Sequence, residues 1–198
     1  MKAGGYRRLS RTVYDQPPAM KGHSMDISRF CELLGQPSVD GDMGRDWQEL
    51  EARTGVSLPD DYKRFVSAYG PGCVNDQLYL FHPRAVEGGE GLRLESLWEQ
   101  ASFAYAELSR SVPEMYPHPV HPAVGGCVPV ARSVSGNHVF LAPPQVVGGD
   151  WSVVLEMGDW LSLPMSFTEF LWAALRGELG IPVVEGEASF EPVGAVEP

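Results

Sequence analysis

The first patterned segment of the chain places apolar side chains at helical spacing. Residues 26–34 carry four of them at positions i, i+3, i+4 and i+7, the pattern of an amphipathic helix: Ile27, Phe30, Cys31 and Leu34. Gly35 follows directly, and Pro37 comes two residues later, so the pattern predicts a short helix that ends there.

Two further short helices are predicted over residues 46–55 and 59–70. The first begins with Asp46 and has Glu49 three residues later, a variant of the capping box. The second begins with Pro59, a residue favoured at the first helical position. Its inward face consists of four large apolar or aromatic residues: Tyr62, Phe65, Val66 and Tyr69.

A strand and a longer helix follow. A turn is expected over residues 71–75, and the alternating run 77–81 predicts a strand. The helix then runs from residue 94 to Pro113, with an apolar stripe at helical spacing: Leu94, Leu97, Trp98, Ala101, Tyr105 and Leu108.

From residue 127 the hydrophobic period changes from helical to two. Four strands are predicted, as two hairpins with Gly-containing turns: 127–132, 137–142, 151–157 and 159–163. Ser166 and Glu169 then form a capping box for a closing helix that ends at Gly177. The pattern as a whole predicts one α+β domain over residues 25–178, in which helices lead, a mixed but antiparallel-rich sheet follows, and a helix closes the domain.

Both ends of the chain differ from this domain. Residues 1–24 have a net charge of +4 from five basic residues and Asp15, with no periodic apolar face, which predicts a disordered basic arm. Residues 179–198 form an acidic tail rich in Pro and Glu, which we expect to be mobile.

Composition narrows the classes of function. The 198 residues carry a net charge of −11. Because residues 1–24 contribute +4, residues 25–198 carry −15, and this negative charge argues against direct nucleic-acid binding. The run 115–131 contains no Asp, Glu, Lys or Arg and is as long as any such run in the chain, but its four prolines prevent a membrane-spanning helix. Three widely spaced cysteines indicate neither a disulfide framework nor a zinc site, and favour a cytoplasmic protein.

Residues 46–83 resemble the opening of SUKH-superfamily domains, the Smi/Knr-type immunity protein family. The matching pattern is Leu-Pro-x-x-Tyr-x-x-Phe from Leu58 to Phe65, followed by Tyr-Gly at 69–70 and an aromatic strand end at Phe81. The second half fits as well, with Val-Pro-Val at 128–130, Gly-Asn at 136–137 and Ser-Phe-x-x-Phe from 166 to 170. The resemblance covers about residues 26–178. Each matched residue also has a plain structural role, so the motif identifies a fold and no site.

The resemblance implies a function based on binding. Many members of the family are bacterial immunity proteins that bind and neutralise a polymorphic toxin, often a nuclease, and fungal relatives are regulatory interaction modules. We therefore expect a cytoplasmic, non-catalytic protein-binding domain without a cofactor, whose partner is a cognate toxin domain. The alternative is a regulatory scaffold that binds a cellular protein.

The candidate partner-binding residues are the acids that lie densest near predicted loops. An acidic face suits the basic, nucleic-acid-binding cleft of a toxin, although the same residues also serve as helix-dipole partners or solubilising surface. The candidates are Asp60, Asp61, Asp76, Glu87, Glu90, Glu95 and Glu99.

Catalytic and metal sites are weakly indicated. His118 and His121 have a spacing that a metal pair can use, but the prolines around them prevent the helix that would align both rings. His82 and His138 stand at strand ends, where hydrogen-bonded structural histidines are expected. No nucleophile motif is present, so we predict neither an enzyme nor a metal site.

Overall fold

The computed structural model describes residues 26–37, 44–85, 91–182 and 184–193, and it confirms the α+β class. A 3-10 turn, η1 (Ile27–Phe30), leads into the helices α1 (Cys31–Leu34), α2 (Gly44–Thr54) and α3 (Asp60–Tyr69). The strands β1 (Gly72–Val74) and β2 (Leu78–Leu80) and the helix α4 (Leu94–Ser111) come next. The second half comprises β3 (Val128–Ser133), β4 (His138–Ala142), β5 (Ser152–Glu156), β6 (Trp160–Leu163), α5 (Phe167–Leu175) and β7 (Phe190–Pro192).

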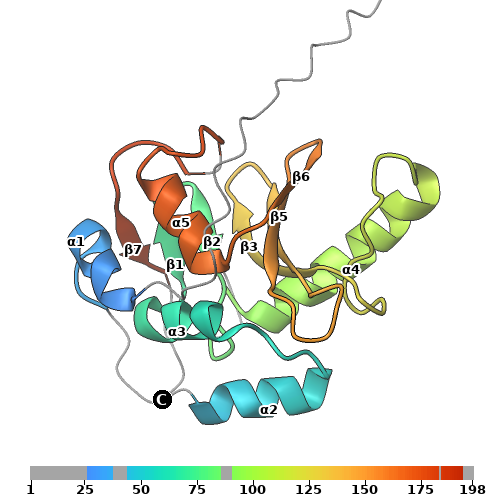
Figure 1. Cartoon of the computed structure of the whole chain (residues 1–198), viewed down its shortest axis with the longest axis horizontal. Helices are drawn as coiled ribbons and strands as arrows, with labels where there is room; N and C mark the ends of the chain where they lie inside the picture. Colours follow the sequence, from blue (N-terminus) through green and yellow to red (C-terminus); the bar gives the residue numbers. More distant parts are fainter. Residues whose placement is uncertain (1–25, 38–43, 86–90, 183, 194–198) are drawn as a thin grey trace, which may run out of the picture.

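The seven strands form one antiparallel sheet in the order β6-β5-β4-β3-β2-β1-β7 (Figure 1). The run from β1 to β6 is a meander, because each of these strands pairs with the next one in sequence. Helix α4 is inserted between β2 and β3 without interrupting their pairing. Only β7 departs from chain order, since it returns to the far edge of β1.

Side chains alternate between the two faces of the sheet, and each face has its own core. Phe140 of β4 packs against Tyr105 of α4, with ring centroids 5.3 Å apart. Its neighbours Val139 and Leu141 belong instead to the larger core, which contains the apolar faces of α3 and α5. The sheet is therefore covered by helices on both faces (Figure 1), as a strand buried on both sides requires.

Aromatic rings fill the larger core between α3 and α5. Phe65 is fully buried, stacks on Tyr69 at 4.9 Å and meets Phe30 edge-on at the same distance. Tyr62 meets Phe167, the first residue of α5, with ring centroids 5.0 Å apart. These contacts confirm the inward stripe that the helical spacing predicts for residues 62–69.

Two strands differ from the sequence-based expectation. The segment expected to be a turn, 71–75, contains β1, and the tail expected to be mobile contains β7, which pairs Glu191 with Cys73. Asn75 holds the tail, because its side chain donates to the carbonyl of Glu185 and accepts from the amide of Ser189. These three-residue strands show no hydrophobic periodicity of their own, and only pairing with distant segments makes them strands.

Gly72 allows β7 to approach closely. A Cβ atom at this position would lie 2.2 Å from the Phe190 ring and 2.6 Å from the carbonyl oxygen of Glu191. The ring of Phe190 in turn packs against Tyr69 at 5.4 Å and links the strand to the main core.

Phe65→Ala should lower the free energy of unfolding by about 3–5 kcal/mol, because it empties the centre of the aromatic core. The matched control is Phe103→Ala on the outer side of α4, where the ring is 73% exposed, and this change should cost less than about 0.5 kcal/mol. Urea titration followed by circular dichroism measures both. Equal losses for the two variants would contradict the assigned core.

Candidate functional site

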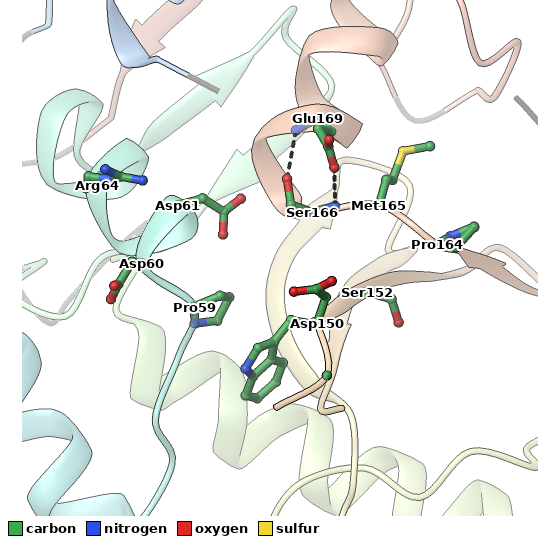
Figure 2. A pocket seen from close by; sticks show the side chains of 12 residues that line it. Pro59, Asp60, Asp61, Arg64, Asp150, Ser152, Pro164, Met165, Ser166 and Glu169 are labelled. Atoms are coloured by element: carbon green, nitrogen blue, oxygen red, sulfur yellow. Dashed lines mark hydrogen bonds between the residues drawn. The ribbon is translucent and has the colours of Figure 1, made fainter. Parts of the chain in front are cut away.

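The candidate site is an open hollow of about 530 Å³ where the starts of α3 and α5 meet the start of β5 (Figure 2). The loop between β4 and β5 and the loop between β6 and α5 complete its rim. Four acidic residues and one arginine line it: Asp60, Asp61, Asp150, Glu169 and Arg64. The remaining lining includes Trp151, Met165 and two prolines, so the walls are partly apolar.

Asp61 bonds α3 to α5. Its Oδ2 accepts from the backbone amide of Thr168 at 2.9 Å and from the Thr168 hydroxyl at 3.0 Å. The amide belongs to the first turn of α5, whose N–H groups have no partner within the helix. Asp61 thus caps a neighbouring helix, and its negative charge lies at the positive end of that helix dipole.

The first turn of α5 is also capped from within. The Ser166 hydroxyl accepts from the amide of Glu169, and the Glu169 carboxylate accepts from the amide of Ser166 at 2.8 Å. The predicted capping box is therefore confirmed. With the bond from Asp61, the amides of both Thr168 and Glu169 have acceptors, so they are not available to bind an anion.

Consecutive residues of α3 take different environments because a helix turns about 100° per residue. Asp60 is exposed and forms an ion pair with Lys63 one turn later at 3.1 Å, whereas Asp61 is only 7% exposed. Lys63 also binds Glu51 at 3.0 Å, which connects α3 to the end of α2.

Asp150 forms the opposite wall of the hollow. It lies at the end of the β4–β5 loop and is exposed. It has no hydrogen bond or ion pair with any described residue. Figure 2 shows its carboxylate pointing toward that of Asp61 across the hollow, while Asp60 points away. The hollow thus has two carboxylates that face each other.

The candidate acidic residues that the structure describes do not form one cluster. Asp60 and Asp61 lie at the hollow, Asp76 is exposed in the β1–β2 turn, and Glu99 is exposed on α4. Glu95 binds Arg53 at 2.9 Å and Arg93 at 3.6 Å. Glu87 and Glu90 lie outside the described residues.

Sequence reasoning missed Asp150 and assigned Glu169 to helix capping alone. No spacing rule connects residues 61 and 150, because their approach depends on how α3 packs against the sheet. The sequence offered one signal for Asp150, its position after Gly148 and Gly149 at the start of a strand, where functional loop residues are common.

A second polar cluster lies on the α4 face of the sheet. The Tyr105 hydroxyl donates to Glu156 at 2.8 Å, so it accepts from Nδ1 of His138 at 3.1 Å. Burial lowers the pKa of His138 to about 4, assisted by Arg132 and opposed by Glu156. Burial also raises the pKa of Tyr105. This cluster joins α4 to β4 and β5 with a neutral imidazole.

The remaining histidines take structural positions. His82 is fully buried, accepts from the amide of Arg84 at 3.1 Å, and has a pKa lowered to about 4, first by burial and second by Arg84. His118 packs against Trp160, and His121 against Trp98. Within the described residues no three His, Cys, Asp or Glu side chains gather as metal ligands, and no helix is long and apolar enough to span a membrane.

Comparison with known proteins finds no match for this chain. The chain matches no model of a protein family, and neither the curated proteins nor the solved structures include a significant match.

Asp61→Ala should lower the free energy of unfolding by about 2–3 kcal/mol, because it leaves the buried Thr168 amide and hydroxyl without an acceptor. Asp60→Ala removes the adjacent, exposed carboxylate and should cost less than about 1 kcal/mol. Urea unfolding of the two variants measures the difference. A similar small loss in both would show that the α3–α5 bond does not stabilise the fold.

His138→Asn should flatten the dependence of stability on acid pH. The folded-state pKa of about 4 lies below the unfolded value of 6.5, so the unfolded state binds the proton first and wild-type stability falls as pH drops from about 6.5 to about 4. Each such group contributes a slope of up to about 1.4 kcal/mol per pH unit. Unfolding free energies at several pH values measure the slope of stability against pH, and identical slopes for variant and wild type would contradict a neutral imidazole at His138.

Proposed function

We propose that this chain is a cytoplasmic, non-catalytic immunity protein that binds and neutralises a cognate toxin. Two kinds of support combine. Residues 46–83 and the second-half motifs resemble SUKH-type immunity proteins, whose expected fold class is α+β, and the structure is of that class. The observation that carries the proposal is the charge of −11, with exposed acids at Asp60, Asp76, Glu99 and Asp150.

The mechanism that follows is occlusion of a basic surface. Toxins that cleave nucleic acids bind phosphates with Lys and Arg, so their active clefts carry positive charge. An acidic protein is steered toward such a cleft by long-range attraction, which raises the association rate above that of neutral partners. Neutralisation then requires only that the cleft be covered.

Two polar clusters among the described residues have structural roles. Asp61 holds Thr168, and Tyr105 holds Glu156 and His138, so these groups connect elements of the fold.

The test is capture followed by neutralisation. The tagged full chain is used as bait in the lysate and secreted fraction of its source cell, and a recovered polypeptide is expressed in a test bacterium with and without the chain. We expect a toxin domain that arrests growth, and restored growth on co-expression. Recovery of cellular proteins without toxicity would favour the alternative, a regulatory scaffold.

The association rate with that toxin should fall by about tenfold or more between low salt and roughly 0.5 M salt, because screening removes the long-range attraction. Surface plasmon resonance separates this effect from the dissociation rate. An association rate that does not change with salt would contradict electrostatic steering.

A further inference from the structure

The edge of β1 is occupied by a segment that returns from the far end of the described chain (Figure 1). β7 pairs with β1 in the antiparallel sense, which places Phe190 opposite Val74 and Glu191 opposite Cys73. β7 is the terminal strand of the described sheet. Residues 185–193 therefore lie on the sheet as an added edge strand, which is also how extended peptides bind to the open edges of sheets.

One aromatic ring supplies the main side-chain contact of this segment. The Phe190 ring lies directly over Gly72, where an added Cβ atom would be 2.2 Å from the ring. The ring also meets Tyr69, with centroids 5.4 Å apart. A glycine in one strand thus leaves a place that an aromatic ring of the neighbouring strand fills. Glu191 and Pro192, which follow in β7, are exposed.

The polar contacts of the segment reach only β1 and the turn after it. Asn75 binds the carbonyl of Glu185 and the amide of Ser189. Gln77 donates to the same carbonyl at 3.3 Å and accepts from the amide of Glu185 at 2.8 Å. Release of the segment would leave the pairing of β1 with β2 intact, while the buried Val184 would keep the segment tethered to the main core.

The charge of the segment does not favour its position. Residues 185–193 contain three glutamates and no lysine or arginine. Burial, followed by the charges of Asp76 and Glu191, raises the pKa of the Cys73 thiol to about 11, so both carboxylates act on the same strand. Because like charges repel, backbone pairing and one ring have to hold the segment in place.

We propose that the edge of β1, with the space over Gly72 beside Tyr69, is a binding site for an extended segment of a partner polypeptide that carries an aromatic residue, and that residues 185–193 occupy this site as a displaceable internal ligand. Backbone pairing gives such a site its affinity, and the place for the ring gives it selectivity. The proposal concerns the edge of β1 alone and does not depend on the immunity function.

The internal ligand competes with a free one through its effective concentration. This concentration is on the order of 1 mM for a segment on a short linker. A free peptide with a Kd on the order of 0.1 mM for the empty edge therefore binds the wild-type chain about tenfold more weakly than a chain whose own strand is impaired.

The test titrates a fluorescent synthetic peptide with the sequence of residues 185–193 against the full chain carrying Phe190→Ala, with fluorescence anisotropy as the readout. We expect saturable binding with a Kd on the order of 0.1 mM, and about tenfold weaker binding to the wild-type chain. The matched probe is the same peptide with Phe190→Ala, which should bind neither chain. Lack of saturable binding to the variant chain, or equal binding of both peptides, would overturn the proposal.

Phe140→Leu is the control for general loosening of the fold. It reduces the core on the α4 face of the sheet, away from β7, so peptide binding should stay as weak as in the wild type. An equal gain in binding for Phe140→Leu and Phe190→Ala would contradict a specific site. Sedimentation of the wild-type chain tests the other occupant, because a dimer that Phe190→Ala dissociates would assign the edge to a second copy and overturn the proposed partner.

Alkylation of Cys73 measures detachment in the wild-type chain, so the proposal stays testable if Phe190→Ala does not fold. Cys73 and Cys127 are 6% and 4% exposed, and burial is the first cause that raises the pKa of each thiol to about 11. Only Cys73 is paired with β7, so iodoacetamide should modify it at least about tenfold faster than Cys127, as mapped by mass spectrometry. Equal rates would show that the segment leaves only on global unfolding and would overturn the proposal.

Discussion

The arrangement of the helices over the sheet depends on one buried carboxylate. Asp61 leaves water to accept two hydrogen bonds from Thr168, and the desolvation cost is offset because those donors belong to the positive end of α5. The bond joins residues 61 and 168, which lie in the first turns of two helices far apart in sequence. With the contact between Tyr62 and Phe167 beside it, this bond fixes where α3 and α5 meet.

The candidate site is a consequence of that junction. The first turns of α3 and α5 are joined by this bond, and the hollow lies beside them, with Asp150 at the end of the β4–β5 loop on its other side. The same carboxylate that bonds to α5 through Oδ2 also lines the hollow. The Tyr105 cluster on the opposite face joins α4 to β4 and β5.

Acidic side chains have different roles at different positions of this chain. Glu95 and Glu169 are engaged with Arg53 and with the first turn of α5, so they contribute to internal bonds. Asp76 and Asp150 are exposed and contribute to the long-range field that attracts a basic partner. Sequence alone treats all these residues as equal negative charges, because exposure and pairing are properties of the folded chain.

The sequence by itself determined the elements whose signals are local. The stripe from Tyr62 to Tyr69 and the Ser166–Glu169 box need only nearby residues, so α3 and α5 were predictable, and so was the α+β class. Tertiary structure alone decided β1 and β7, since residues 72–74 and 190–192 show no alternating pattern that predicts a strand and become strands only by pairing with each other and, for β1, with β2. It also decided that Asp61 is buried and faces Asp150, because the approach of these residues depends on packing between segments that no local pattern connects.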